Sequence, residues 1–475
     1  MIDEVTLPLV DGVRVVAPRS MLLLTPYVLT EQQDWFEDEI RFLRLILQPG
    51  DRVIDVGANY GTYTLSMAKC VGPTGHVWAF EPASATAEYL ARGVAANAFS
   101  HVTLERSALS REAGEAQLGL NENAELNALV RGGKATARYE AVPLTTLDLC
   151  MDRLGWNSIA FLKLDAEGEE VNILSGGHRF FAELSPLVQY EIKAADGVDR
   201  ATLQAFAPLG YNSYRLVRGL NLLVPFDADK TVDGFLLNLF ACKPDRARML
   251  ADRGWLLDAA IHMRTTGRTR SQAIAAHIND PRAPYGWRRA IGALPYGTLL
   301  TDLWGRRGSR KRAQLEESLA FYALSQDTAR PAIERFDALE VSVTMLRGLC
   351  TRQPSLAHWA SLARAANDFG ERAVAVDALR QLAELLARSA NADFSDPFVA
   401  PCARFDHVPP GPRMDQWLLA ATIEAFELNG AYSSFYSGDT ARARLESFQA
   451  LCATNPSFAS PQMARRLDLV RARTA

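Results

Sequence analysis

The sequence predicts an α/β domain with a doubly wound, mostly parallel sheet, followed by an all-α domain. Three observations lead to this prediction. Between residues 51 and 243, short β-branched runs alternate with helical stretches, the pattern of a sheet covered by helices on both faces. The runs are almost continuously apolar, as strands of a buried parallel sheet are. After residue 243 the strand signals stop, and helical spacing rich in Ala, Leu and Arg follows.

Seven segments carry the strand prediction, and the short spacing before the last one suggests a closing antiparallel pair. They are residues 53–56, 76–80, 102–104, 159–164, 187–190, 212–217 and 235–241. Between residues 115 and 146 the pattern is strand-like but irregular, so we expect an inserted hairpin or lid with a turn at Gly132 and Gly133.

The remaining elements complete the domain plan. Residues 1–28 read as a small β extension, and residues 35–47 have helical apolar spacing that Pro49 and Gly50 end. We therefore expect four regions. They are an N-terminal extension with a cap helix at 1–50, the α/β domain at 51–243, a basic helical connector at 244–313 and an α-helical domain at 314–475.

Length and composition agree with this plan. A chain of 475 residues suggests two or three domains, and 48% hydrophobic with 22% charged residues excludes wholesale disorder. No apolar run approaches the roughly 18 residues that a membrane span needs, and the first residues do not read as a secretory signal. The six cysteines form no C-x-x-C pair for zinc or thiol chemistry, so we expect reduced cysteines in a cytoplasmic protein.

The charge is divided unevenly along the chain. Residues 1–243 carry 21 Lys and Arg against 31 Asp and Glu, whereas residues 244–475 carry 30 against 24. The front half is therefore acidic, with a net charge of −10. Because phosphate contacts supply most non-specific affinity for nucleic acid, we expect no nucleic-acid partner there.

The most informative segment is a glycine turn that follows the first strand of the α/β domain. Its glycines let the backbone reverse tightly and let a ligand approach the main chain. A dinucleotide would need free amides for its pyrophosphate, but an acid just before the turn would repel phosphate. S-adenosylmethionine has no phosphate, and an acid attracts its ammonium and sulfonium groups. The expected cofactor-binding residues here are Asp55, Gly57, Ala58, Asn59 and Gly61.

The next two strands extend the expected cofactor site. Glu81 ends the second strand 24 positions after Gly57, where an acid suits the two hydroxyls of a ribose. Pro82 follows it directly. Ser107 and Ala108 come after the third strand and are placed to meet an adenine ring. The alternative is a strand-helix corner with a surface glutamate, which the number of matching positions disfavours.

Four sequence blocks resemble the FkbM-type family of S-adenosylmethionine-dependent methyltransferases. They read Val-Ile-Asp-Val-Gly-Ala-Asn-Tyr-Gly, Ala-Phe-Glu-Pro, Leu-Lys-Leu-Asp-Ala-Glu-Gly-Glu-Glu and Tyr-Glu-Ile, at residues 53–61, 79–82, 162–170 and 190–192. Tyr60 and Ala166 depart modestly from the family's usual Ile and Val. The resemblance covers roughly residues 35–243. It implies a seven-stranded Rossmann-like methyltransferase sheet that acts on a hydroxyl, often of a sugar, and it does not fix the acceptor.

A group of acids follows the strand at residues 159–164. Ligands of an open sheet bind beyond the carboxyl ends of its strands, which places Asp165 and Glu167 beside the methyl group, near Glu191. Methyl transfer to a hydroxyl needs a base, and we expect Asp165 in this role, with Glu167 or Glu191 orienting it. Asp165 is also an expected cofactor contact. Glu169 and Glu170 have a structural explanation, because acids stabilise a helix N-terminus.

A second mechanism would let Asp165, Glu167 and Glu191 hold a magnesium ion that acidifies the acceptor hydroxyl, because Mg²⁺ prefers oxygen ligands. The D-x-D pair of the α/β domain, Asp227 and Asp229, lies in a later loop. We therefore expect S-adenosylmethionine as the cofactor and no metal.

The back of the chain reads as helix pairs. Residues 358–366, with Ala375 and Leu379, match the tetratricopeptide spacing at the Trp, Leu and Ala positions, but Ala363 and Ala366 replace the usual Gly and Tyr. The alternative is an ordinary helical bundle. Residues 285–312 place basic residues and Trp around an apolar stretch, which permits contact with an anionic membrane, although a packed connector is the favoured interpretation.

Together these features predict an O-methyltransferase joined to a helical domain that recognises the acceptor or a protein partner. The expected acceptor is a glycan or a glycosylated intermediate, on family resemblance alone. Two alternatives stay open: methylation of a small natural-product hydroxyl, and a binding scaffold with a degenerate methyltransferase fold.

Overall fold

The computed structural model describes residues 3–130, 138–194, 197–229, 231–257, 286–305, 310–388 and 392–474. They form two compact units. The first comprises Met1–Leu216, Pro225–Val232 and Leu236–Arg253, and the second comprises Val217–Val224, Asp233–Phe235 and Gly254–Ala475.

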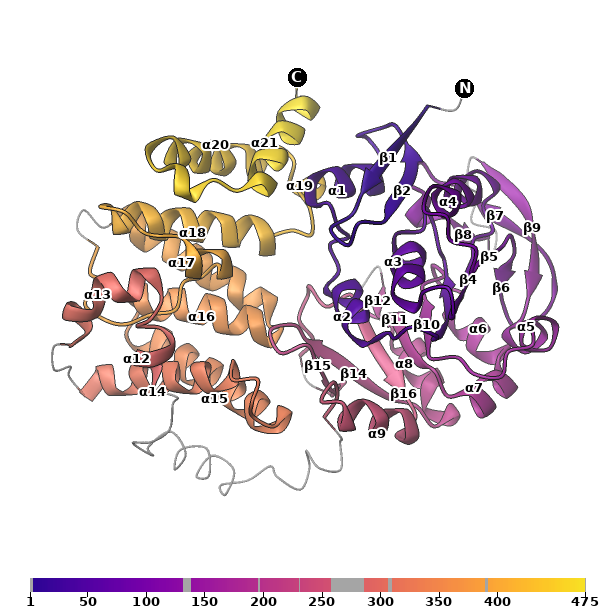
Figure 1. The fold of residues 1–475 in the computed structure, drawn as a ribbon, viewed down its shortest axis with the longest axis horizontal. Helices are drawn as coiled ribbons and strands as arrows, with labels where there is room; N and C mark the ends of the chain where they lie inside the picture. The colour runs from indigo at the N-terminus through magenta and orange to yellow at the C-terminus, as the bar shows by residue number, and fades with distance from the viewer. Residues whose placement is uncertain are drawn as a thin grey trace. The chain divides into compact units, whose positions relative to one another are not determined.

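The first unit holds the predicted sheet, apart from most of the edge strand β15 (Leu222–Pro225), whose residues 222–224 are counted with the second unit (Figure 1). The strand order is β15-β14-β16-β11-β10-β3-β4-β5. The strands β11, β10, β3, β4 and β5 are parallel to their neighbours in this series, and β16 is antiparallel to both β11 and β14. Their bounds are β3 (Arg52–Val56), β4 (His76–Phe80), β5 (Val102–Glu105), β10 (Phe161–Leu164), β11 (Leu187–Glu191), β14 (Asn212–Val217), β15 (Leu222–Pro225) and β16 (Asn238–Cys242).

The fold class is therefore confirmed, and the sheet has one strand more than the predicted seven. The additional strand is β15, a run of four residues whose Leu-Leu-Val-Pro sequence lies only a short turn beyond β14. The closing antiparallel strand is β16, which inserts between β11 and β14.

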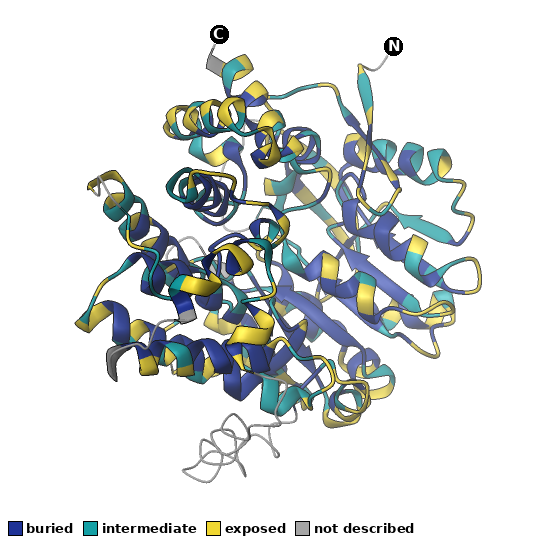
Figure 2. Ribbon diagram, turned by 60° about the vertical axis from the view of Figure 1, so that its left-hand side comes forward, coloured by how far each residue is buried: buried dark blue, intermediate teal, exposed yellow. Residues whose placement is uncertain are grey.

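Helices cover both faces of this sheet, and strand alternation decides which residues meet them. One face carries Ile54, Leu162 and Val188, which pack in a single apolar core with residues of α5 to α8. Buried strands lie between helices in Figure 2. The helices of the unit after the cap helix are α3 (Thr62–Val71), α4 (Ser84–Ala96), α5 (Leu147–Leu154), α6 (Glu170–Ser175), α7 (His178–Leu184), α8 (Arg200–Phe206) and α9 (Pro244–Asp252).

The N-terminal extension differs from the prediction in one part. Strands β1 (Glu4–Pro8) and β2 (Arg14–Pro18) form the expected β extension and pair antiparallel. The β prediction is wrong from Leu24 onward, where α1 (Leu24–Gln32) begins. Pro26 lies in the first turn of α1, where its missing N–H costs no helical hydrogen bond. The cap helix is confirmed as α2 (Asp38–Ile46).

The irregular segment after β5 forms a second sheet. Its four strands, β6 (Ala108–Leu109), β7 (Gly114–Gly119), β8 (Ala128–Leu129) and β9 (Tyr139–Thr145), lie in the order β6-β9-β7-β8. A short 3-10 turn, η1 (Ala124–Leu126), precedes β8. The predicted turn at Gly132 and Gly133 lies outside the described residues. Smaller elements are β12 (Lys193–Ala194), β13 (Gly197–Val198) and η2 (Ala207–Leu209).

The second unit is helical, as predicted, and has its own apolar core around Trp304, Trp417 and Phe398. Its elements are α12 (Trp287–Ala290), α13 (Pro295–Gly305), α14 (Arg310–Ser325), α15 (Ala332–Arg352), α16 (Leu356–Phe369), α17 (Arg372–Arg388), η3 (Ala403–His407), α18 (Met414–Asn429), α19 (Ser434–Ser437), α20 (Asp439–Thr454), η4 (Pro456–Phe458) and α21 (Pro461–Thr474).

Parts of the predicted basic connector, residues 258–285 and 306–309, lie outside the described residues. Among the residues that the structure does describe, no helix combines the length and apolar character needed to cross a membrane. All six cysteines are free, as expected.

Candidate active site

The glycine turn between β3 and α3 fits tightly against the neighbouring strand. Gly57 has a φ of 74°, and a Cβ added to it would come 1.8 Å from the backbone oxygen of Asp165. Gly61 has a φ of 90°, and a Cβ there would come 2.4 Å from Leu90 of α4. Both positions therefore require glycine. The close approach at Gly57 also brings the backbone of Asp165 against the turn.

The amides of this turn are already used within the chain. The N–H groups of Gly57 and Ala58 donate to the Phe80 oxygen at 3.1 and 3.0 Å, and the Gly61 N–H donates to the Ala58 oxygen at 2.9 Å. The Asn59 N–H donates to Glu81 Oε2 at 2.9 Å. A pyrophosphate needs such amides to be free, so the turn is poorly suited to a dinucleotide. This agrees with the sequence argument from Asp55.

Asp55 offers a place for a cationic group. Its side chain is fully buried, and its Oδ2 accepts a hydrogen bond from the Thr64 hydroxyl at 2.5 Å. Its Oδ1 is buried and has no hydrogen-bond partner within the described residues. Burial raises the pKa of Asp55, while the nearby charge of Lys163 opposes this shift. Because a buried acceptor without a partner is costly, the free oxygen fits a ligand that carries a positive donor.

Glu81 lies at the end of β4 with its carboxylate held by the backbone. Its Oε1 accepts from the Ala83 N–H and its Oε2 from the Asn59 N–H, both at 2.9 Å. Burial raises the pKa of Glu81 to about 7, although these two hydrogen bonds oppose the shift. Each carboxylate oxygen can accept a further hydrogen bond, so a role toward ribose hydroxyls is compatible with this geometry.

The expected adenine contacts lie beside this segment. Ala108, the first residue of β6, packs with Ala83 in a small apolar cluster, and Ser107 precedes it. Pro82, half-buried, stands between Glu81 and Ala83. The structure thus brings Ser107 and Ala108 to the same edge as Pro82.

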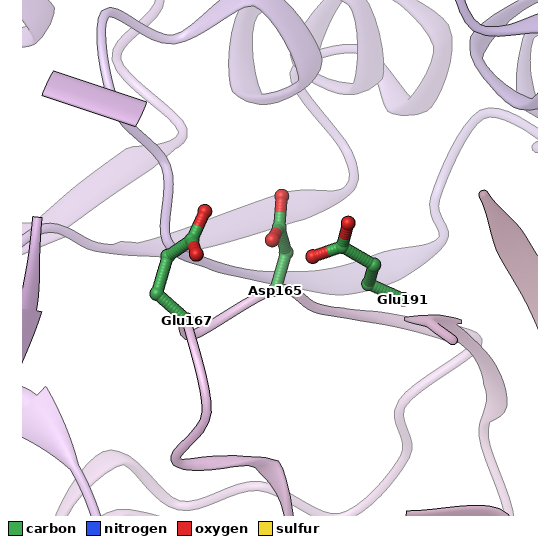
Figure 3. A group of neighbouring side chains, drawn as sticks. All are labelled: Asp165, Glu167 and Glu191. Atoms are coloured by element: carbon green, nitrogen blue, oxygen red, sulfur yellow. The ribbon is translucent and has the colours of Figure 1, made fainter. Parts of the chain in front are cut away.

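Three acids meet at the carboxyl edge of β10 and β11, as predicted (Figure 3). Asp165 follows β10, Glu191 ends β11, and Glu167 lies in the turn after Asp165 with a φ of 48°. One oxygen of each carboxylate lies within 4.8 Å of the others. Like charges at this spacing disfavour simultaneous ionisation.

The pKa values of the two glutamates in the cluster are raised to near neutral pH. Desolvation, followed by the charges of Asp165 and Glu167, raises the pKa of Glu191 to about 8. Glu167 is exposed as a residue, but its carboxylate is crowded, and desolvation with the charges of Asp165 and Glu170 raises its pKa to about 7. Both glutamates can therefore exchange protons near neutral pH.

A buried lysine that the sequence argument missed lies under this cluster. The Lys163 ammonium pairs with Asp165 Oδ2 at 2.6 Å. It also lies over the Tyr63 ring, 5.1 Å from the centroid. A lysine within the apolar run Phe161–Leu164 was the available signal, because buried lysines require partners. Asn238 was missed too. It faces Glu191 across the strand pair, and its buried Nδ2 has no partner within the described residues.

Glu169 and Glu170 have the structural roles expected of them. Glu170 Oε1 accepts from the N–H groups of Ala166 and Gly168 at 2.9 and 3.3 Å, and so closes the turn before α6. Glu169 accepts a hydrogen bond from the Ser110 hydroxyl. The three acids of the cluster have oxygen donors that could suit a cation, but Lys163 already supplies positive charge to Asp165. We therefore assign no metal to them.

Comparison with known proteins agrees with this geometry. Residues 55–211, a third of the chain, match the family described as methyltransferase FkbM domain. No curated protein matches the chain.

Three similar solved structures are methyltransferases. A methyltransferase FkbM from Methylobacillus flagellatus is 17% identical over 40% of this chain and 43% of that one, with a TM-score of 0.27. A SAM-dependent O-methyltransferase from Thermotoga maritima is 16% identical over 50% of this chain and 77% of that one, with a TM-score of 0.26. A SAM dependent methyltransferase from Aquifex aeolicus is 14% identical over 46% and 92%, with a TM-score of 0.26.

A mostly parallel sheet, a glycine turn closed to phosphate and a buried acid with a free oxygen are compatible with an S-adenosylmethionine-dependent methyltransferase. The family match makes this more specific: residues 55–211 match the methyltransferase FkbM domain.

Proposed function

We propose that this chain transfers a methyl group from S-adenosylmethionine to a hydroxyl group, and that a sugar or glycan carries that hydroxyl. One observation carries the proposal. The backbone of Asp165 lies directly against Gly57, so the candidate base is next to the turn that would hold the donor. The family resemblance supports a hydroxyl acceptor.

Each residue of the site has a proposed role in binding or in proton transfer. Bound S-adenosylmethionine supplies a methyl group on a sulfonium, which is a good leaving group. Asp55 would hold a positive group of the donor, and Glu81 would bind its ribose. Asp165 would accept the proton of the acceptor hydroxyl, and Glu167 or Glu191 would orient Asp165. Positioning can contribute about 7–11 kcal/mol, and a placed base about 10²–10⁴-fold in rate.

The charge of the site bears on the acceptor class. Lys163 compensates Asp165, and Glu167 and Glu191 exchange protons near neutral pH, so these four residues leave a neutral to weakly negative edge with no net positive charge. An anionic acceptor would find no attraction there at short range, whereas a neutral sugar hydroxyl needs none. We also propose that the helical unit recognises the acceptor or a protein partner. A membrane contact at residues 285–312 is the less favoured proposal.

The test uses the full chain in two stages. Calorimetry with S-adenosylmethionine, with NAD as the competing ligand class, should give heat with the first and none with the second. Transfer of a tritiated methyl group is then measured over neutral glycans, anionic glycans and small natural-product polyols. Label on neutral glycans supports the proposal, and label on small polyols alone favours the small-molecule alternative. Binding of NAD without S-adenosylmethionine would overturn the assignment.

A further inference from the structure

Lys163 stands in the middle of a polar row that crosses the central sheet. Asp55 of β3, Lys163 of β10 and Gln189 of β11 are register partners, so their side chains lie on one face of the sheet. All three are buried, and Lys163 is only 5% exposed. A lysine buried to this degree needs compensating charge, which the neighbouring elements supply.

Carboxylates surround the ammonium from several elements. It pairs directly with Asp165 at 2.6 Å. Asp55 and Glu37, at the N-terminus of α2, also stabilise its charged form, and together these acids raise the pKa of Lys163 despite its burial. The ring of Tyr63 covers another side of it. The charge of Asp165 also acts on Glu167, Glu170 and Glu191.

The partners of Lys163 are themselves fixed in place. The Tyr63 hydroxyl donates to Glu37 and accepts from Gln189 Nε2 at 3.1 Å. This holds the aromatic ring against the ammonium group. Lys163 is therefore held between two acids. Asp55, with its free oxygen, precedes the donor turn, and Asp165 belongs to the acid cluster at the acceptor edge.

We propose that Lys163 is a positioning residue that couples the donor site to the acceptor edge. Its ammonium holds the Asp165 carboxylate through the direct ion pair and also interacts electrostatically with Asp55. A sulfonium donor bound near Asp55 would therefore change the electrostatic environment of Asp165 through the lysine. This inference rests on the proposed function, because it needs a cationic donor at Asp55. If the lysine served folding alone, any response of Asp165 to the charge of the donor would be direct and would not depend on Lys163.

The experiment compares two ligands that differ at the reacting centre. S-adenosylmethionine carries a sulfonium charge, and S-adenosylhomocysteine is the neutral thioether. The full chain is labelled with carbon-13 at the aspartate side-chain carboxyls, and Asp165→Asn identifies the Asp165 signal. We expect saturating S-adenosylmethionine to displace this signal more than S-adenosylhomocysteine does. Lys163→Met should reduce that difference by more than half, and Lys163→Arg should retain it.

Lys243→Met is the matched control. Lys243 is a lysine of the same unit that stacks on Tyr211 and contacts no acid of the cluster, so its variant should respond as the wild type does. Should Lys163→Met fail to fold, nitrogen-15 labelling of the lysine side chains in the wild type replaces it, with Lys163→Arg identifying the signal. The Lys163 signal should then distinguish the two ligands.

The outcomes separate the two levels of the proposal. A wild-type chain that binds neither ligand in calorimetry overturns the proposed function and this coupling with it. Binding of both ligands with equal effects on the Asp165 or Lys163 signals overturns the coupling alone. A ligand difference that persists unchanged in Lys163→Met has the same meaning, because the response would then not pass through the lysine.

Discussion

Replacing Gly57 by alanine would place a methyl carbon 1.8 Å from the backbone oxygen of Asp165, and a φ of 74° would have to be kept. The left-handed conformation costs a residue with a Cβ about 1–2 kcal/mol. Overpacking adds typically about 1–3 kcal/mol, and the obstacle here is backbone, which cannot rotate away. We therefore expect a loss of about 2–5 kcal/mol in the free energy of unfolding of the first unit.

The matched control separates the clash from the backbone conformation. Gly155, the C-cap of α5, has a φ of 64°, and an added Cβ there meets nothing within 4 Å. Gly155→Ala should therefore cost only about 1–2 kcal/mol. Urea unfolding is followed by hydrogen exchange of peptides that cover β3 and β10, because whole-chain signals would mix the two units.

Donor binding by the two variants is also measured. Gly57→Ala should also weaken binding of S-adenosylmethionine by at least about tenfold, or about 1.4 kcal/mol, because the turn must move to relieve the clash. Gly155→Ala should bind it normally. Equal stabilities of the two variants, within about 0.5 kcal/mol, would refute the reasoning from the close approach.

Three other predictions follow from the acid cluster. Asp165→Asn should abolish turnover while donor affinity is kept, and Asp227→Asn, in a loop outside the cluster, should keep both; loss of donor affinity would make Asp165 a binding residue. The pKa of Glu191, about 8 against an ordinary 4.5, means that the folded state holds a proton that the unfolded state releases, so this group's stabilising contribution falls as pH rises from about 4.5 through 8. The free energy of unfolding, measured with urea, should therefore rise in Glu191→Gln relative to the wild type by about 2 kcal/mol between pH 4 and pH 9, after allowance for the partial exposure of Glu191. The control variant Glu183→Gln changes an exposed glutamate and should show no such gain. EDTA should leave the methyl-transfer rate unchanged, and a loss restored by Mg²⁺ would contradict our decision to assign no metal.

Local patterns carried most of the fold prediction. The apolar strand before Gly57, the helix signals after residue 314 and the mostly parallel sheet of an α/β domain all follow from periodicity and turn chemistry. The N-terminal helix α1 was missed because Leu24–Gln32 contains β-branched residues and a proline, and its helical state depends on burial. β15 was missed although its apolar run is as long as the predicted strand at residues 53–56.

The acids of the candidate site were predicted from the sequence, but the residues around Lys163 were not. Asp165, Glu167 and Glu191 could be grouped because each follows the carboxyl end of a strand, and parallel strands bring these ends to one edge. The sequence did not predict that Lys163, Glu37 and Tyr63 lie together, because their interaction depends on how α2 and α3 pack across the sheet. The position of Lys163 in a buried strand was a local signal, but its partners Glu37 and Tyr63 lie on α2 and α3 and could not be read from the sequence around it.

The place of β16 has a consequence for biosynthesis. The family match ends at residue 211, yet β16 (Asn238–Cys242) completes the sheet by inserting between β11 and β14. A nascent chain that has reached residue 211 therefore exposes an open β11 edge, ready to pair with other chains. At about 5–20 residues per second, the ribosome needs on the order of seconds to deliver the missing strand. During this interval a chaperone that shields strand edges would protect the growing polypeptide from aggregation.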